Sequence, residues 1–127
     1  DTLLGVFGHE LGHVRHRHGM RALVQVGLLS AAASVVLGDF SPWLSAAPAL
    51  LGQLDYSRAA EREADAEAAR LLRCNGLPPA AMVVLFDRLR AHADRGRTLP
   101  VALASHPADE ERRAYFRDGA RDPDAAR

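Results

Sequence analysis

Residues 2–18 read Thr-Leu-Leu-Gly-Val-Phe-Gly-His-Glu-Leu-Gly-His-Val-Arg-His-Arg-His, and this stretch decides how the rest of the chain is interpreted. Asp1 is a good N-cap, and Gly19 is a typical helix stop, so the sequence predicts a helix over about residues 2–18. Within it, His9 and His13 are four residues apart, which is about 400° of helical rotation. The two imidazoles are therefore expected on one face, one turn apart.

Two histidines in this arrangement can share one zinc ion, at about 2.0–2.1 Å from each ring nitrogen. Glu10 is offset by one residue and does not point at the metal itself. It can reach a water held there, act as a general base and carry the proton to a leaving amine. The H-E-x-x-H motif of residues 9–13 thus predicts zinc-dependent hydrolysis of peptide bonds, with Glu10 as the catalytic residue.

Catalytic zinc sites usually have a third protein ligand. Metzincins would supply it within H-E-x-x-H-x-x-G-x-x-H, but position 16 is His rather than Gly and position 19 is Gly rather than His. This class is excluded. The alternative is a glutamate from a second helix, as in His₂Glu sites.

Ser57 is a good cap for a helix over about residues 58–74, which carries several carboxylates. At about 100° per residue, only Glu61 and Asp65 share a face. One can ligate zinc while the other accepts the free N–H of a ligating histidine. We assign Glu61 as the third ligand and Asp65 as the histidine's partner, and we expect the remaining acidic residues, Glu63 and Glu67, on a solvated face.

Further helices are predicted over about residues 22–38, 43–53, 79–95 and 107–116. In the third of these, Met82, Leu85, Phe86 and Leu89 have the spacing of a buried stripe. No strand is readable. The expected fold is all-α, a zincin-like core of five or six helices. Residues 1–117 form the catalytic core in this interpretation, and residues 118–127 form a flexible tail.

The chain has 127 residues, with sixteen basic and sixteen acidic side chains and one cysteine, Cys74. The balanced charge gives no indication of a nucleic-acid partner, and a single cysteine excludes an intrachain disulfide. Because the chain starts at Asp1, just before the motif-bearing helix, we expect a fragment whose upstream part carried any targeting signal.

Three elements of the sequence together resemble the HtpX/CAAX-prenyl-protease family of zinc metallopeptidases, the gluzincins. They are His-Glu-Leu-Gly-His at 9–13, Ser57-Arg58-x-x-Glu61-x-x-Ala64-Asp65, and Ser105-His106-Pro107 followed by Glu111-Arg112. The resemblance implies one zinc ion per chain and endopeptidase activity on membrane-associated or misfolded proteins. It also implies a bacterial cell-envelope location, periplasmic or membrane-associated. The modestly apolar insert between the two metal helices is most similar to that of the BepA-like periplasmic members.

Family members usually have further helices, and often an edge strand, before the H-E-x-x-H helix. We expect this chain to lack that region. Gluzincins align extended substrates along such an edge, so the resemblance implies that substrate binding depends on it.

Two further residues are candidates by position. His106 matches a family loop that approaches the zinc, where it could lie beside the metal or bind the transition-state oxyanion. The alternative is a helix-entry loop in which Pro107 has the structural role. Arg58 either makes a structural ion pair or contacts substrate. His16, His18 and His92 are not expected to be ligands. His18 is expected at a helix C-terminus, where a positive ring favours the dipole.

Residues 22–52 allow two interpretations: a partly buried hairpin over the active site, or shallow contact with a bilayer surface. For the function, the alternatives to a peptidase are a proteolytically latent, zinc-containing chaperone or assembly factor of the cell envelope, and a membrane-interacting scaffold. The intact Glu10 argues against the first, because a structural metal site needs no base beside it, whereas liposome flotation would separate the second from a peptidase.

Overall fold

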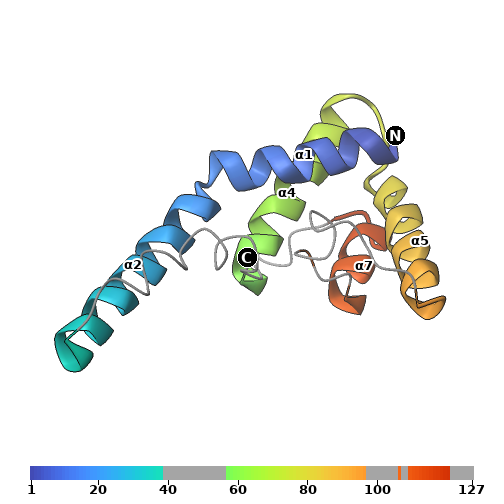
Figure 1. Ribbon diagram of the computed structural model, residues 1–127. Helices are drawn as coiled ribbons and strands as arrows, with labels where there is room; N and C mark the ends of the chain where they lie inside the picture. The colour runs from blue at the N-terminus through green and yellow to red at the C-terminus, as the bar shows by residue number, and fades with distance from the viewer. Residues whose placement is uncertain (39–56, 97–105, 107–108, 121–127) are drawn as a thin grey trace.

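The computed structural model describes residues 1–38, 57–96, 106 and 109–120. These residues form helices and no strand, which confirms the all-α prediction (Figure 1). The elements are α1 (Thr2–Arg15), α2 (His18–Leu37), α4 (Arg58–Cys74), the 3-10 helix η1 (Pro79–Met82), α5 (Val83–Asp94) and α7 (Glu110–Arg117). The helix predicted over 43–53 lies outside the described residues.

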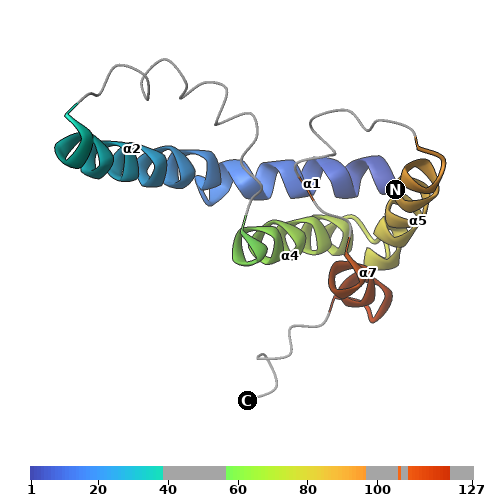
Figure 2. The ribbon, with the colours of Figure 1, turned by 60° about the horizontal axis from the view of Figure 1, so that its bottom comes forward.

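Helices α1 and α4 lie side by side and form the closest packed pair of the described helices (Figure 2). Their backbones approach closely because glycines of α1 face alanines of α4. A Cβ added to Gly12 would lie 2.7 Å from the Cα of Ala64, and one added to Gly8 would lie 2.9 Å from the Cα of Ala68. No side chain fits at such distances, so both positions require glycine even though glycine lowers helix propensity.

The hydrophobic core lies where α4 meets η1, α5 and α7. It consists of Ala68, Ala69, Leu72, Met82, Phe86, Phe116 and Ala120. The predicted stripe is confirmed, since Met82, Phe86 and Leu89 are buried and Leu85 is half-buried. Ala120, which falls in the segment expected to be a flexible tail, is 3% exposed and belongs to this core. The rest of that segment, 121–127, lies outside the described residues.

The prediction that the first helix runs to residue 18 and stops at Gly19 was wrong. Helix α1 ends at Arg15, and α2 begins at His18. Arg17 between them has a left-handed backbone (φ 55°, ψ 37°), which breaks the helical hydrogen-bond ladder before the glycine is reached. His18 therefore stands at the start of a helix, and the expectation that it serves a C-terminal dipole was also wrong.

The helix predicted over 107–116 begins later. Asp109 caps α7 by accepting a hydrogen bond from the backbone N–H of Arg112 at 2.9 Å, so the helix starts at Glu110. By contrast, the boundaries predicted for the 58–74 helix are confirmed. Ser57 accepts the N–H of Ala60 there, as an N-cap does.

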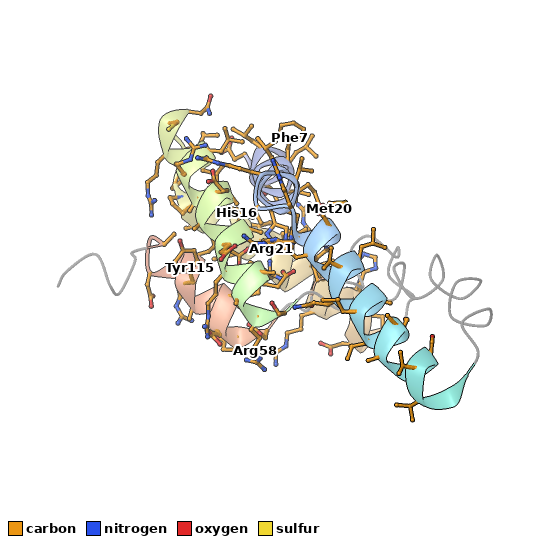
Figure 3. All side chains as sticks on the ribbon, turned by 90° about the vertical axis from the view of Figure 1, so that its left-hand side faces the viewer. Phe7, His16, Met20, Arg21, Arg58 and Tyr115 are labelled. Atoms are coloured by element: carbon orange, nitrogen blue, oxygen red, sulfur yellow. The ribbon has the colours of Figure 1, made fainter. Side chains whose placement is uncertain are left out.

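Helix α2 leaves α1 at the break and projects away from the rest of the helices (Figures 1 and 3). By length and composition alone, residues 18–36 are long and apolar enough to cross a membrane, and very few of them are buried. The described part of the predicted hairpin, residues 22–38, is thus mostly exposed and does not cover the site. Residues 39–52 lie outside the described part of the chain.

Candidate metal centre

Three side chains from two helices converge beside the α1–α4 interface. His9 and His13 come from α1 and Glu61 from α4, and all three are buried. The Nε2 atoms of the two histidines lie 3.1 Å apart. Glu61 places Oε1 3.4 Å from Nε2 of His13 and Oε2 3.5 Å from Nε2 of His9. Because α1 and α4 approach closely at Gly12 and Ala64, side chains from the two helices can reach one another here.

These separations fit a zinc ion. Two donor atoms that are each about 2.0–2.1 Å from a tetrahedral zinc lie roughly 3.3 Å from one another. The donor set, two imidazole nitrogens and a carboxylate oxygen, is also one that zinc accepts. His106 belongs to the same cluster, in which one donor atom of each residue lies within 4.8 Å of the others.

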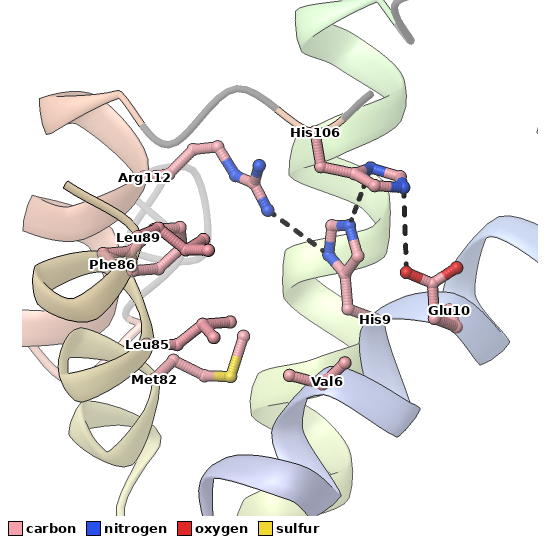
Figure 4. Close-up of a pocket in the computed structure, with 9 residues that line it drawn as sticks. All are labelled: Val6, His9, Glu10, Met82, Leu85, Phe86, Leu89, His106 and Arg112. Atoms are coloured by element: carbon pink, nitrogen blue, oxygen red, sulfur yellow. Dashed lines mark hydrogen bonds and ion pairs between the residues drawn. The ribbon is translucent and has the colours of Figure 1, made fainter. Parts of the chain in front are cut away.

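The other nitrogen of His9 has a carboxylate partner. Its Nδ1 lies 2.9 Å from Oδ1 of Asp65, which is 2% exposed. Asp65 is in turn held by Arg112, whose Nε donates to Oδ2 at 2.7 Å and whose Nη2 donates to Oδ1 at 2.8 Å. A carboxylate on the far nitrogen orients a ligating histidine and raises its basicity. Figure 4 shows the guanidinium of Arg112 directed at His9 from α7.

The charges around the centre favour a cation. Burial alone would raise the pKa of Glu61, but hydrogen bonds from His106 and His13 and the positive charge of Arg112 outweigh it and hold this pKa well below its usual range. Arg112 forms an ion pair with Oε2 of Glu61 through Nη1 at 2.6 Å. Burial lowers the pKa of Arg112, but the carboxylates of Asp65 and Glu61 outweigh burial, so the pKa lies above its ordinary value. Two buried carboxylates against one guanidinium leave one negative charge beside the imidazoles.

His106 and Glu10 lie on the open side of the cluster. Nδ1 of His106 is 2.8 Å from Oε1 of Glu61 and 3.3 Å from Nε2 of His9. Its Nε2 is 3.7 Å from Oε1 of Glu10, whose side chain is about half exposed. Beside them is a pocket with mainly apolar walls from α1, η1 and α5 (Figure 4), lined by Val6, Met82, Leu85, Phe86 and Leu89 together with His9, Glu10, His106 and Arg112.

The structure therefore brings together six of the seven candidate residues and leaves one apart. Arg58 is exposed at the start of α4, where its Nη1 lies 3.4 Å from Glu111 and 3.8 Å from Asp109. Both of these carboxylates belong to α7 or to the residue that caps it, and Arg58 is not part of the cluster.

Sequence reasoning gave no role to three residues that support the centre. Arg112 was part of a matching motif. It lies four residues before Phe116, and this i, i+4 spacing is the sequence signal that could have placed both on the buried face of α7. His18 is buried and lies 2.9 Å from His13, nitrogen to nitrogen. Glu63 is exposed, as expected, but its Oε2 also lies 2.9 Å from Nε2 of His18, a contact that the sequence did not indicate. The helix break at Arg17 accounts for both, because helical periodicity does not continue across it.

Comparisons with known proteins identify relatives of the chain. It is 33% identical over 120 residues to the metalloprotease LoiP and 32% identical over 125 residues to the metalloprotease YcaL, both of Escherichia coli, covering 89% and 93% of this chain. It is 30% identical over 134 residues to the beta-barrel assembly-enhancing protease of the same species, covering 94% of this chain. The chain spans 47% and 48% of the first two relatives and 27% of the third. No solved structure matches it.

The family model of peptidase family M48 matches residues 1–118, nearly the whole sequence. The resemblance inferred from the three motifs is thereby confirmed, including the similarity to BepA-like members, since beta-barrel assembly-enhancing proteases are among the relatives. The chain belongs to peptidase family M48.

Proposed function

We propose that this chain is the catalytic core of a zinc-dependent endopeptidase, with His9, His13 and Glu61 as the metal ligands and Glu10 as the general base. The observation that carries the proposal is the convergence of three side chains: the two Nε2 atoms lie 3.1 Å apart, and the two carboxylate oxygens of Glu61 lie 3.4 Å from one and 3.5 Å from the other. Membership of peptidase family M48 supports the same conclusion and favours a peptidase over a latent chaperone. We expect one zinc ion per chain.

When bound, zinc would supply the Lewis acidity that polarises a peptide carbonyl. It would also lower the pKa of a water molecule, so that the water loses a proton more readily and can attack that carbonyl. The protein's own residues supply the rest. Glu10, exposed at the open side of the cluster, accepts a proton from the attacking water and delivers it to the leaving amine nitrogen. Asp65, fixed by Arg112, keeps His9 in the tautomer whose Nε2 is free of a proton.

His106 is proposed to act beside the metal position. Its Nδ1 lies among the donor atoms and its Nε2 faces Glu10, so the ring stands between the proposed ligands and the proposed base. The apolar pocket next to this ring is suited to an apolar side chain of a polypeptide substrate, because its walls offer few polar partners.

Zinc content tests the metal site. The wild type is expected to retain about one zinc per chain after dialysis, and Glu61→Gln is expected to lose most of it because a neutral amide is a poor zinc ligand. Glu67→Gln, on the same helix but paired with Arg15 and Arg70, is the matched control and should retain the metal. Equal zinc in the wild type and Glu61→Gln would rule out Glu61 as a ligand.

Cleavage of an unfolded protein such as casein tests the base. Glu10→Gln is expected to keep zinc and helical content while losing cleavage. Glu110→Gln is the control, because it removes another exposed carboxylate, whose ion pairs in the described structure are with arginines of its own helix. Equal cleavage by the wild type and Glu10→Gln would exclude the role given to Glu10.

We also propose that the protein acts at the bacterial cell envelope and contacts a membrane surface through α2. Apolar side chains stand exposed along this helix, including Leu28 at 66% and Leu29 at 72%. The name of one relative, a beta-barrel assembly-enhancing protease, supports an envelope location. Flotation with liposomes tests the contact, which should disappear in a variant carrying Leu28→Asp and Leu29→Asp.

A further inference from the structure

The two proposed histidine ligands are supported in different ways. His9 turns Nε2 towards the metal cluster and has the carboxylate of Asp65 on Nδ1. His13 also turns Nε2 towards the cluster, but its Nδ1 lies 2.9 Å from Nδ1 of His18. Nε2 of His18 then lies 2.9 Å from Oε2 of Glu63. A histidine is thus interposed between His13 and a carboxylate.

The helix break creates this arrangement. On a continuous helix His18 would point about 140° away from His13, five residues being about 500° of rotation. The left-handed backbone of Arg17 instead turns the chain so that His18 is the first residue of α2. Its ring is 4% exposed and meets the ring of His13 edge-on, at 4.9 Å between centroids and 75° between planes.

Counting protons gives the three groups one consistent assignment. If Nε2 of His13 binds a metal, the proton of this ring is on Nδ1, and Nδ1–H donates to Nδ1 of His18. That atom must then be the unprotonated one, so the proton of His18 is on Nε2 and donates to the carboxylate of Glu63. Glu63 is held there by two further groups: Nδ1 of His16 at 3.3 Å and Nη1 of Arg21 at 3.6 Å.

We propose that His18 and Glu63 are positioning residues that fix the tautomer and orientation of His13, as Asp65 does for His9. The chain Glu63–His18–His13 joins α4 to both sides of the helix break, so it ties the beginning of α2 to the metal centre. This inference rests on the proposed zinc function. It extends that function to the region that joins α1 to α2.

The same residues also contain a competing arrangement. Donor atoms of His16, His18 and Glu63 all lie within 4.8 Å of one another and could hold a second metal ion. The proton assignment excludes this when the main site is loaded, because Nε2 of His18 then carries the proton given to Glu63. A single metal per chain therefore belongs to the proposal, and a second ion on His18 is an outcome that contradicts it.

The first measurement is the zinc dissociation constant, by competition with a chelator. His18→Leu removes the acceptor for His13 and is expected to weaken zinc binding about 10–100-fold, as loss of a ligand's hydrogen-bond partner does. His18→Asn places an amide oxygen near the position of Nδ1 and should recover much of the loss. His92→Leu is the matched control, because His92 is exposed on α5, belongs to neither histidine cluster, and should leave zinc binding unchanged.

The second measurement is the tautomer of each histidine, from the ¹⁵N shifts of the imidazoles in the zinc-loaded wild type. This readout needs no variant and does not depend on activity. We expect the proton on Nδ1 of His13 and on Nε2 of His18. A proton on Nδ1 of His18, a second zinc ion on His18, or equal affinity in the wild type and His18→Leu would each overturn this inference alone. Absence of zinc from the wild type would overturn the proposed function, and the inference with it.

Discussion

Helices α1 and α2 are neighbours in the chain and are both rich in apolar residues, yet α1 packs along α4, whereas α2 is mostly exposed beyond its first residue. One face of α1 carries Gly5, Gly8 and Gly12, which are buried, and the closest backbone approaches are to α4. Helix α2 has a glycine too, Gly27, but a Cβ added there would meet nothing within 4 Å. Apolar composition does not distinguish the two helices. The difference is that α1 has a face of glycines against which the backbone of α4 packs, and α2 has no such packed face in the described structure.

The largest expected effect tests the polar network that holds the packed half together. Arg112→Ala removes the buried partner of Asp65 and Glu61 and should lower the free energy of unfolding by about 3–5 kcal/mol, since unpaired buried charges remain. Urea unfolding in the presence of a chelator measures it. The control is Arg58→Ala, an exposed ion pair, which should change stability little. Similar losses in both would mean that burial of the network does not matter.

A pair of leucines sharpens the comparison of core with α2. Leu72→Ala empties a fully buried site on α4 and should cost about 2–5 kcal/mol. Leu29→Ala on α2 should stay within about 0.5 kcal/mol, because this side chain is 72% exposed. Both are read from urea unfolding of the chain in the same buffer. A large loss at Leu29 would show that α2 is packed in solution.

A pair of glycines tests the helix interface directly. Gly12→Ala should destabilise the protein by about 1–3 kcal/mol, because the new Cβ meets the backbone of Ala64 at 2.7 Å. Gly27→Ala has open space and should stabilise α2 by up to about 1 kcal/mol through helix propensity. Thermal unfolding with chelator present separates packing from metal binding. We expect the two substitutions to change the stability in opposite directions. A change in the same direction would contradict the difference drawn between α1 and α2.

The smallest expected effect lies at the rim of the α1–α4 interface. Burial raises the pKa of Glu67, but Arg70 and Arg15 outweigh it and hold the pKa below its ordinary value of 4.5. A carboxyl with a lowered folded-state pKa adds stability above its unfolded pKa and loses it as the pH falls through the folded pKa. Glu67→Gln should therefore cost less than about 1 kcal/mol at neutral pH. The cost should vanish in acid, as unfolding at several pH values would show.

The local parts of the site could be predicted from the sequence because they depend on helical spacing alone. His9 and His13 lie one turn apart on α1, and Glu61 and Asp65 lie one turn apart on α4, and the structure brings both pairs together. The cap at Ser57 and the buried stripe from Met82 to Leu89 depend on the same local rules. Periodicity holds wherever the backbone remains a regular helix.

Periodicity stops at Arg17, and beyond this residue helical spacing no longer places the side chains relative to α1. The left-handed residue changes the direction of His18, so that a ring expected at a helix end became a neighbour of His13, and Glu63 became its partner. The backbone conformation of a single residue decides this. No pattern of residue types in the 2–18 stretch indicated where the left-handed residue would be.

By itself, the sequence determined the helical fold class, the H-E-x-x-H motif and the pair of acidic residues that faces it, because each depends on helical spacing. Only the tertiary structure decided which distant groups complete the centre. Arg112 reaches Asp65 across 47 positions of the chain, and His106 reaches His9 across 97. Such contacts depend on how helices pack, here on how closely α1 and α4 approach at glycine and alanine. Packing of that kind is a property of two surfaces together, which neither helix carries in its own sequence.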